Sequence, residues 1–213
     1  MSDLASTSGH EAKILSAGWL RTWAIAAALT LLLLGGVEAV WRASGFRPAL
    51  NDDARLWAAA RRRVRPDSTV LVGSSRMHAD VRPATFAEVT GADTVQLAVT
   101  GGMSYPVLED LARDPSFKGT VVCELSEVEI STGITTPLER DFVREYRRES
   151  PAGRAEAFLQ RPVQERLALG LPQLTAPSVF GSLLRGPRPE PSAAAYSVAA
   201  DRTLSVDFSK VDL

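Results

Sequence analysis

The most extended apolar run of the chain lies near its N-terminus, over Trp23–Trp41, and reads WAIAAALTLLLLGGVEAVW. It holds one charged residue, Glu38, close to its end, and tryptophans lie near both ends. A helix of about 19 residues rises about 28 Å, which matches the hydrocarbon thickness of a bilayer. The pattern therefore predicts a transmembrane helix over residues 19–41, preceded by an N-terminal tail over residues 1–18.

Two alternatives to a membrane anchor stay open for this segment. A buried helix of a soluble protein has the same composition, and a cleaved signal peptide has a similar apolar stretch. An uncleaved anchor is favoured because no small-x-small cleavage site follows Val40. The orientation is open: counting arginines would place the C-terminal part in the cytoplasm, but a folded domain weakens that rule.

Three short apolar runs follow, over Thr69–Val72, Thr94–Val99 and Thr120–Leu125. Each run is continuous rather than alternating, which is typical of strands buried on both faces of a parallel sheet. Helix signals lie between them, in Pro83–Gly91 and after Ser104. This order predicts right-handed βαβ crossovers and a three-layer α/β fold.

The predicted α/β core covers residues 51–130 and opens with an amphipathic helix over Asn51–Arg65, capped by Asn51 or Asp52. Its apolar face would hold Trp57, Ala60 and Val64. Four arginines near its end are interpreted as its solvent-exposed face, with binding of lipid headgroups as the alternative: Arg61, Arg62, Arg63 and Arg65.

The pattern weakens over residues 131–213, which we expect to form a helical and loop insertion followed by an incomplete C-terminal part. Over residues 150–174 we expect short helices that are broken by proline and lie over the site. Over residues 183–197 we expect a loop, because this segment is rich in Pro, Ser and Gly. Residues 203–213 alternate like an edge strand. Doubly wound sheets usually have about five strands or more, so the fold is expected to be incomplete.

Composition narrows the class of function only slightly. The formal net charge of −1 over 213 residues gives no electrostatic reason to expect nucleic acid as a partner. The single cysteine, Cys123, excludes an internal disulfide and a cysteine metal cluster, and is interpreted as a small core residue. We expect no metal and no cofactor.

Polar residues and glycines follow each of the three strands, where the chemistry of a parallel sheet gathers. They form three segments: Gly73–Arg76, Thr100–Gly102 and Glu124–Glu127. A serine on a tight glycine turn, with backbone N–H groups beside it, is how an acyl-transfer site is assembled. Glycines at a neighbouring strand end allow the main chain to approach an oxyanion closely.

The segment VLVGSS resembles the first block of the SGNH (GDSL-type) hydrolase superfamily, a strand that ends in Gly-Asp-Ser, and QLAVTGG is similar to the second block. The resemblance implies a flavodoxin-like sheet and a parent activity of serine esterase or O-acyl transfer on envelope carbohydrate or lipid. It assigns Ser75 as the nucleophile and Gly101 to the oxyanion hole. Candidate substrate-binding residues are Ser74, Arg76 and Gly102.

The same resemblance implies a membrane-anchored bacterial protein. We expect a single-pass protein of the inner membrane, in contact with the lipid bilayer, with the soluble domain on the periplasmic side. Its substrate would be a glycan or lipid of the envelope.

The chain departs from the superfamily in its later blocks. CELSEVE lacks the asparagine of the third block, and no histidine follows His78 to activate the serine. A serine hydroxyl without a base is a poor nucleophile, so this chain is expected to be inactive, either as the N-terminal part of a longer enzyme or as a degenerate relative. His78 is a candidate base, against the alternative of a surface or turn histidine.

Other interpretations of the serine turn stay open. Gly73–Arg76 would also suit an ordinary βα turn or an anion-binding loop, although the Gly-Lys-Ser/Thr of a Walker loop is absent. A non-catalytic protein of an envelope assembly is a further alternative. Glu127 and Glu129 are interpreted as a solvated strand end, with an acid pair or a metal site as the alternative.

Overall fold

The computed structural model describes residues 4–133, 136–171, 174 and 196–206. The chain divides into two units, Met1–Phe46 and Arg47–Leu213, and each is described by itself. Most of the loop predicted over residues 183–197 lies outside the described residues, because the description resumes at residue 196.

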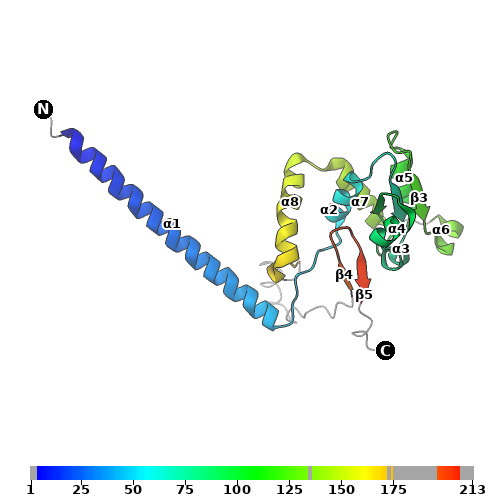
Figure 1. Ribbon diagram of the computed structural model, residues 1–213, viewed down its shortest axis with the longest axis horizontal. Helices are drawn as coiled ribbons and strands as arrows, with labels where there is room; N and C mark the ends of the chain where they lie inside the picture. Colours follow the sequence, from blue (N-terminus) through cyan, green and yellow to red (C-terminus); the bar gives the residue numbers. More distant parts are fainter. Residues whose placement is uncertain (1–3, 134–135, 172–173, 175–195, 207–213) are drawn as a thin grey trace. The chain divides into compact units, whose positions relative to one another are not determined.

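The first unit is built on α1, an uninterrupted helix over Leu4–Ala43 (Figure 1). Its segment Gly18–Ala43 has a mean hydropathy of 1.9 and is long and apolar enough to cross a membrane. The helix already begins at Leu4, so residues 4–17, which lie in the predicted tail, are helical and precede the candidate span. Glu38 accepts a hydrogen bond of 2.6 Å from Arg42 one turn later, so this carboxylate is paired along the helix.

The second unit contains a parallel sheet of three strands in the order β2-β1-β3. The strands are β1 (Thr69–Val72), β2 (Thr94–Gln96) and β3 (Thr120–Cys123). The predicted strands and their parallel arrangement are confirmed, and β1 is buried along its whole length. β3 is only half-buried, whereas β2, the other edge strand of the described sheet, is buried along its length. Cys123 at its end is half-buried too.

The remaining elements alternate with the sheet and follow it (Figure 1). They are α2 (Ala54–Arg62), α3 (Ser75–Asp80), α4 (Pro83–Thr90), α5 (Tyr105–Ala112), α6 (Glu127–Thr132), α7 (Pro137–Arg148), α8 (Pro151–Arg166), the 3₁₀ turn η1 (Ala168–Gly170), and the antiparallel hairpin of β4 (Tyr196–Val198) and β5 (Leu204–Val206).

Local sequence explains most of these boundaries. Asp53, rather than Asn51 or Asp52, caps α2, and its carboxylate accepts from the N–H groups of two residues in the first turn. α4 begins at Pro83, as predicted. The prediction that proline breaks the later helical region is wrong for Pro162, which lies inside α8.

Helices cover both faces of the sheet, which confirms a mixed α/β arrangement in layers. On one face, Trp57 of α2 and Phe142 of α7 pack with Val70 and Val72 of β1. On the other face, Leu71 packs against residues of α3 and α4. The indole N–H of Trp57 donates to the carbonyl of Leu97 over 2.9 Å, so the largest core side chain has no unpaired polar group.

The arginine cluster at the end of α2 is not a solvent-exposed face as a whole. Arg61 is buried and donates to Asp110 and to Asp114, each over 2.8 Å. Hydrogen bonds from Ser116 and from Arg61 lower the pKa of Asp114 to about 2. Sequence pattern missed this because the partners of Arg61 lie 49 and 53 residues further along the chain.

Arg62 also has a partner, Glu149, whereas Arg63 and Arg65 are exposed. The interpretation of a solvent-exposed face therefore holds for Arg63 and Arg65 only.

Replacing Arg61 with Ala should lower the free energy of unfolding by about 1.5–3 kcal/mol. The buried Asp110 would keep its hydrogen bond to Arg147 but lose the one to Arg61, and Asp114 would lose its arginine partner. Arg63→Ala in the same turn is the matched control and should change it by less than about 0.5 kcal/mol. Urea unfolding of the detergent-solubilised full chain measures both. Equal effects of the two substitutions would contradict the structural role of Arg61.

Candidate functional site at the carboxyl edge of the sheet

The ladder between β1 and β2 continues past the end of β2. The N–H of Leu97 donates to the carbonyl of Leu71 over 2.8 Å, and the N–H of Val99 donates to the carbonyl of Gly73 over 2.9 Å. This register carries the chain directly into the turn at Thr100–Gly102. The two predicted segments, Gly73–Arg76 and Thr100–Gly102, therefore leave the sheet side by side.

The turn after β2 is closed by a hydrogen bond from the N–H of Gly102 to the carbonyl of Val99, 2.9 Å long. Gly101 has φ +77°, which a type II turn requires at this position and which other residues rarely adopt. The turn leaves Thr100 exposed. The N–H of Gly102, predicted to contact substrate, is already used within the turn.

The two serines in the turn after β1 have different surroundings. Ser74 precedes α3, and both its hydroxyl and its N–H donate to Oε2 of Glu124, each over 2.7 Å. Ser75 begins α3 and is exposed. Gly73 is required by close packing, since a Cβ there would lie 2.6 Å from the Cβ of Met77. Ser74 is therefore held by the protein itself, whereas Ser75 faces solvent.

Glu124 opens the third polar segment, which was interpreted as a solvated strand end, but its carboxylate is bonded to the turn after β1. Its second carboxylate oxygen accepts a hydrogen bond of 2.6 Å from Arg76, which supplies a partner for that arginine. Burial alone would raise the pKa of Glu124, but the hydrogen bonds from Ser74 and Arg76 outweigh it and hold the pKa below its usual value. The groups that an anion would use at this turn are thus already bonded to a carboxylate.

The two glutamates after β3 have separate surroundings. Glu129 is buried and accepts from the N–H groups of Ser104 and Tyr105, over 2.6 and 2.9 Å, at the start of α5. Its interpretation as a solvated strand end is wrong, while Glu127 is exposed. Within the described residues no group of three or more His, Cys, Asp or Glu side chains could hold a metal ion.

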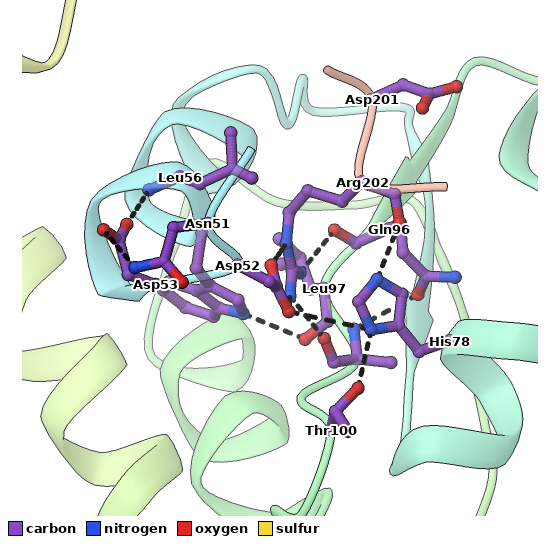
Figure 2. Close-up of polar contacts among 12 residues, drawn as sticks. Asn51, Asp52, Asp53, Leu56, His78, Gln96, Leu97, Thr100, Asp201 and Arg202 are labelled. Atoms are coloured by element: carbon purple, nitrogen blue, oxygen red, sulfur yellow. Dashed lines mark hydrogen bonds and ion pairs between the residues drawn. The ribbon is translucent and has the colours of Figure 1, made fainter. Parts of the chain in front are cut away.

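His78 is buried, with 1% of its surface exposed, so the alternative of a surface histidine is wrong. Figure 2 shows its ring between Thr100 and the backbone of Arg202. Nε2 lies 2.7 Å from the carbonyl oxygen of Arg202, and Nδ1 lies 3.0 Å from Oγ1 of Thr100. Because a carbonyl oxygen only accepts, the proton of the neutral ring belongs on Nε2. Nδ1 then accepts from the Thr100 hydroxyl.

Arg202 organises this cluster from the hairpin of β4 and β5. Its backbone is left-handed, with φ 63°, and its side chain is fully buried. The guanidinium forms two hydrogen bonds with Asp52, of 2.8 and 2.9 Å. It also donates to the carbonyls of Gln96 and Ala98, over 3.1 and 2.8 Å (Figure 2).

The surroundings of His78 favour its uncharged form. Burial and the neighbouring Arg202 guanidinium lower the pKa of His78. The carboxylate of Asp52, whose Oδ2 lies 3.7 Å from Nδ1, raises the pKa but does not outweigh them. Within the described residues neither ring nitrogen contacts Ser75.

A cavity of about 330 Å³ adjoins the cluster. Asp52, His78 and Thr100 line it together with side chains from the segment before α2, from α7 and from the hairpin. Its walls are mainly apolar, including Leu50, Val99, Leu138, Phe142, Val198 and Leu204. An apolar cavity with a few converging polar groups is typical of a small-molecule site.

No family model, curated protein or solved structure matches this chain.

The free energy of unfolding should fall as the pH decreases below about 6.5, the pKa of an unperturbed histidine, because the unfolded chain takes up a proton that folded His78 resists. The stabilisation is complete above that pH and is lost towards the lower folded-state pKa, by at most about 1.4 kcal/mol per pH unit. Denaturant unfolding at pH 7.5, 6.5 and 5.5 measures this slope. His78→Gln should flatten the slope between pH 6.5 and 5.5, and an unchanged slope would contradict the burial of a neutral ring.

Proposed function

We propose that this chain is a membrane-anchored α/β protein of SGNH-hydrolase type whose parent chemistry is serine esterase activity or O-acyl transfer on envelope carbohydrate or lipid. α1 would anchor it in the bacterial inner membrane as a single span, with the α/β unit on the periplasmic side. The sheet order and the helices on both of its faces are compatible with a flavodoxin-like arrangement.

The observation that carries this proposal is the extended ladder between the first two strands. The hydrogen bond from Val99 to Gly73 brings Gly101 alongside the turn that holds Ser75. A left-handed glycine beside an exposed serine suits a backbone N–H aimed at an oxyanion. The same register supports the pairing of the two sequence blocks on which the resemblance rests.

Ser75 itself has no activating group within the described residues. His78 is engaged with Thr100 and Arg202, and the carboxylate of Glu124 is engaged with Ser74 and Arg76. A serine without a base reacts slowly. We therefore assign the Ser75 turn to substrate binding in this chain rather than to turnover.

Hydrolysis of p-nitrophenyl acetate by the full chain should be unchanged, within about twofold, in the Ser75→Ala variant, because an unactivated hydroxyl contributes little to the rate. Absorbance of released p-nitrophenol measures the rate. Ser74→Ala is the neighbouring control for effects on the fold. A decrease of more than tenfold in Ser75→Ala alone would mean that Ser75 is an active nucleophile.

Binding is measured separately, by saturation-transfer NMR with an O-acetylated monosaccharide. We expect binding to the full chain and weaker binding to Gly101→Val, because valine does not tolerate the φ of this turn. Absence of binding to the unmodified chain would argue against the proposed substrate class.

A further inference from the structure

The imidazole of His78 lies beside a hydroxyl, but that hydroxyl is not a serine. Oγ1 of Thr100 is 3.0 Å from Nδ1 of His78, and Nε2 of the same ring is fixed over 2.7 Å by the carbonyl of Arg202. A hydroxyl in reach of a base that a third group orients is the arrangement that activates a nucleophile. Thr100 is exposed and lines the cavity described above.

We infer that Thr100 is a nucleophile and His78 its general base, in a site that takes esters with a short apolar acyl group. The inference rests on the proposed acyl chemistry and moves the reacting hydroxyl from Ser75 to Thr100. It depends on three separate features: the contact between Thr100 and His78, the support of the ring from the hairpin, and the cavity next to both residues.

The chemical step involves only groups of the chain, the ester and water. Oγ1 of Thr100 forms a bond to the acyl carbon while its proton passes to Nδ1 of His78. The bond from the acyl carbon to the alcohol oxygen then breaks, and that oxygen takes the proton from Nδ1. Water then gives a proton to the same nitrogen and bonds to the acyl carbon. The bond from the acyl carbon to Oγ1 breaks, Oγ1 takes the proton back from Nδ1, and the carboxylic acid leaves.

Charges around His78 suit a ring that is neutral at rest and briefly charged during the reaction. Asp52 lies 3.7 Å from Nδ1 and would stabilise the imidazolium that forms on proton uptake. Arg202 lies on the other side of Asp52, is bonded to it twice, and keeps the resting ring uncharged. The carbonyl of Arg202 fixes the tautomer that leaves Nδ1 free to accept.

The turn after Thr100 supplies the group that the developing oxyanion needs. Gly101 follows the nucleophile directly, and its φ of +77° is part of the type II turn that fixes the peptide plane between Thr100 and Gly101. In acyl-transfer sites, the backbone N–H after the nucleophile commonly contributes to the oxyanion hole. Gly101 therefore keeps the role predicted for it, with Thr100 in place of Ser75.

The cavity defines the class of acyl group. Its volume is about 330 Å³, and apolar side chains such as Leu138, Phe142 and Leu204 form its walls. An acetyl or butyryl group would fit such a space together with part of the alcohol that it esterifies. This size favours O-acetyl and short O-acyl esters over phospholipids.

Steady-state hydrolysis of p-nitrophenyl butyrate by the full chain, compared with its Thr100 variants, tests the inference. Thr100→Val keeps the shape and removes the hydroxyl, so turnover should fall at least about 100-fold. Thr100→Ser keeps a hydroxyl and should restore turnover to within about tenfold. Thr90→Val makes the same substitution at an exposed threonine outside both turns. It is the matched control and should behave as the unmodified chain. Turnover of the palmitate ester should be at least tenfold slower than that of the butyrate.

Acyl groups trapped by an acid quench and located by peptide mass spectrometry provide a second readout that does not depend on the rates. We expect the butyryl group on the peptide that contains Thr100. Unchanged turnover in Thr100→Val, or no turnover above that of buffer, would overturn the inference. Loss of turnover in Ser75→Ala with an acyl group on Ser75 would also overturn it, while leaving acyl transfer at the proposed serine in place. Circular dichroism of each variant confirms that the fold is intact.

Discussion

The buried ion pair between Arg202 and Asp52 is the interaction on which the rest of the site depends. It joins the hairpin of β4 and β5 to the segment before α2, across 150 positions of sequence. The same guanidinium donates to the carbonyls of Gln96 and Ala98, so it also fixes the chain where β2 ends. Removing one partner from such a pair typically costs about 3–5 kcal/mol, because the other is left buried and charged.

This pair also determines the chemistry of the imidazole beside it. With the side chain of Arg202 fixed, its carbonyl faces Nε2 of His78, and the ring is left with Nδ1 towards Thr100. The histidine lies only three positions after Ser75, yet it serves the neighbouring strand end. Both ring nitrogens contact groups outside α3, namely the Thr100 hydroxyl and the Arg202 carbonyl, which proximity in sequence could not indicate.

The ends of β1 and β2 therefore carry two separate sets of polar contacts. At the end of β1, Ser74, Arg76 and Glu124 satisfy one another and leave Ser75 exposed. At the end of β2, the exposed Thr100 lies 3.0 Å from the buried imidazole of His78. The proposed acyl chemistry and the threonine nucleophile are separate proposals, and each has its own measurement.

Much of the fold could be predicted because it depends on local pattern. Continuous apolar runs identified the parallel strands, and Pro83 marked the start of α4. The long-range polar contacts could not be predicted in this way. Arg61 looked like a solvent-exposed residue, since nothing nearby in sequence indicates the acidic residues that neutralise it.

The cluster around His78 was beyond sequence reasoning for the same reason. Its geometry depends on Arg202, 124 positions away from the histidine, and on a hairpin that the alternating pattern near the C-terminus only partly suggested. The candidate glycine could be found from its motif, whereas the base and its supporting arginine required the structure.

The protonation state of His78 tests this arrangement most directly. ¹⁵N NMR of the imidazole nitrogens near pH 7, assigned by comparison with His78→Gln, distinguishes the two neutral tautomers from the charged ring. We expect a neutral ring protonated at Nε2, with Nδ1 accepting a hydrogen bond. A ring protonated at Nδ1, or a charged imidazolium at that pH, would contradict the assignment of His78 as the base for Thr100.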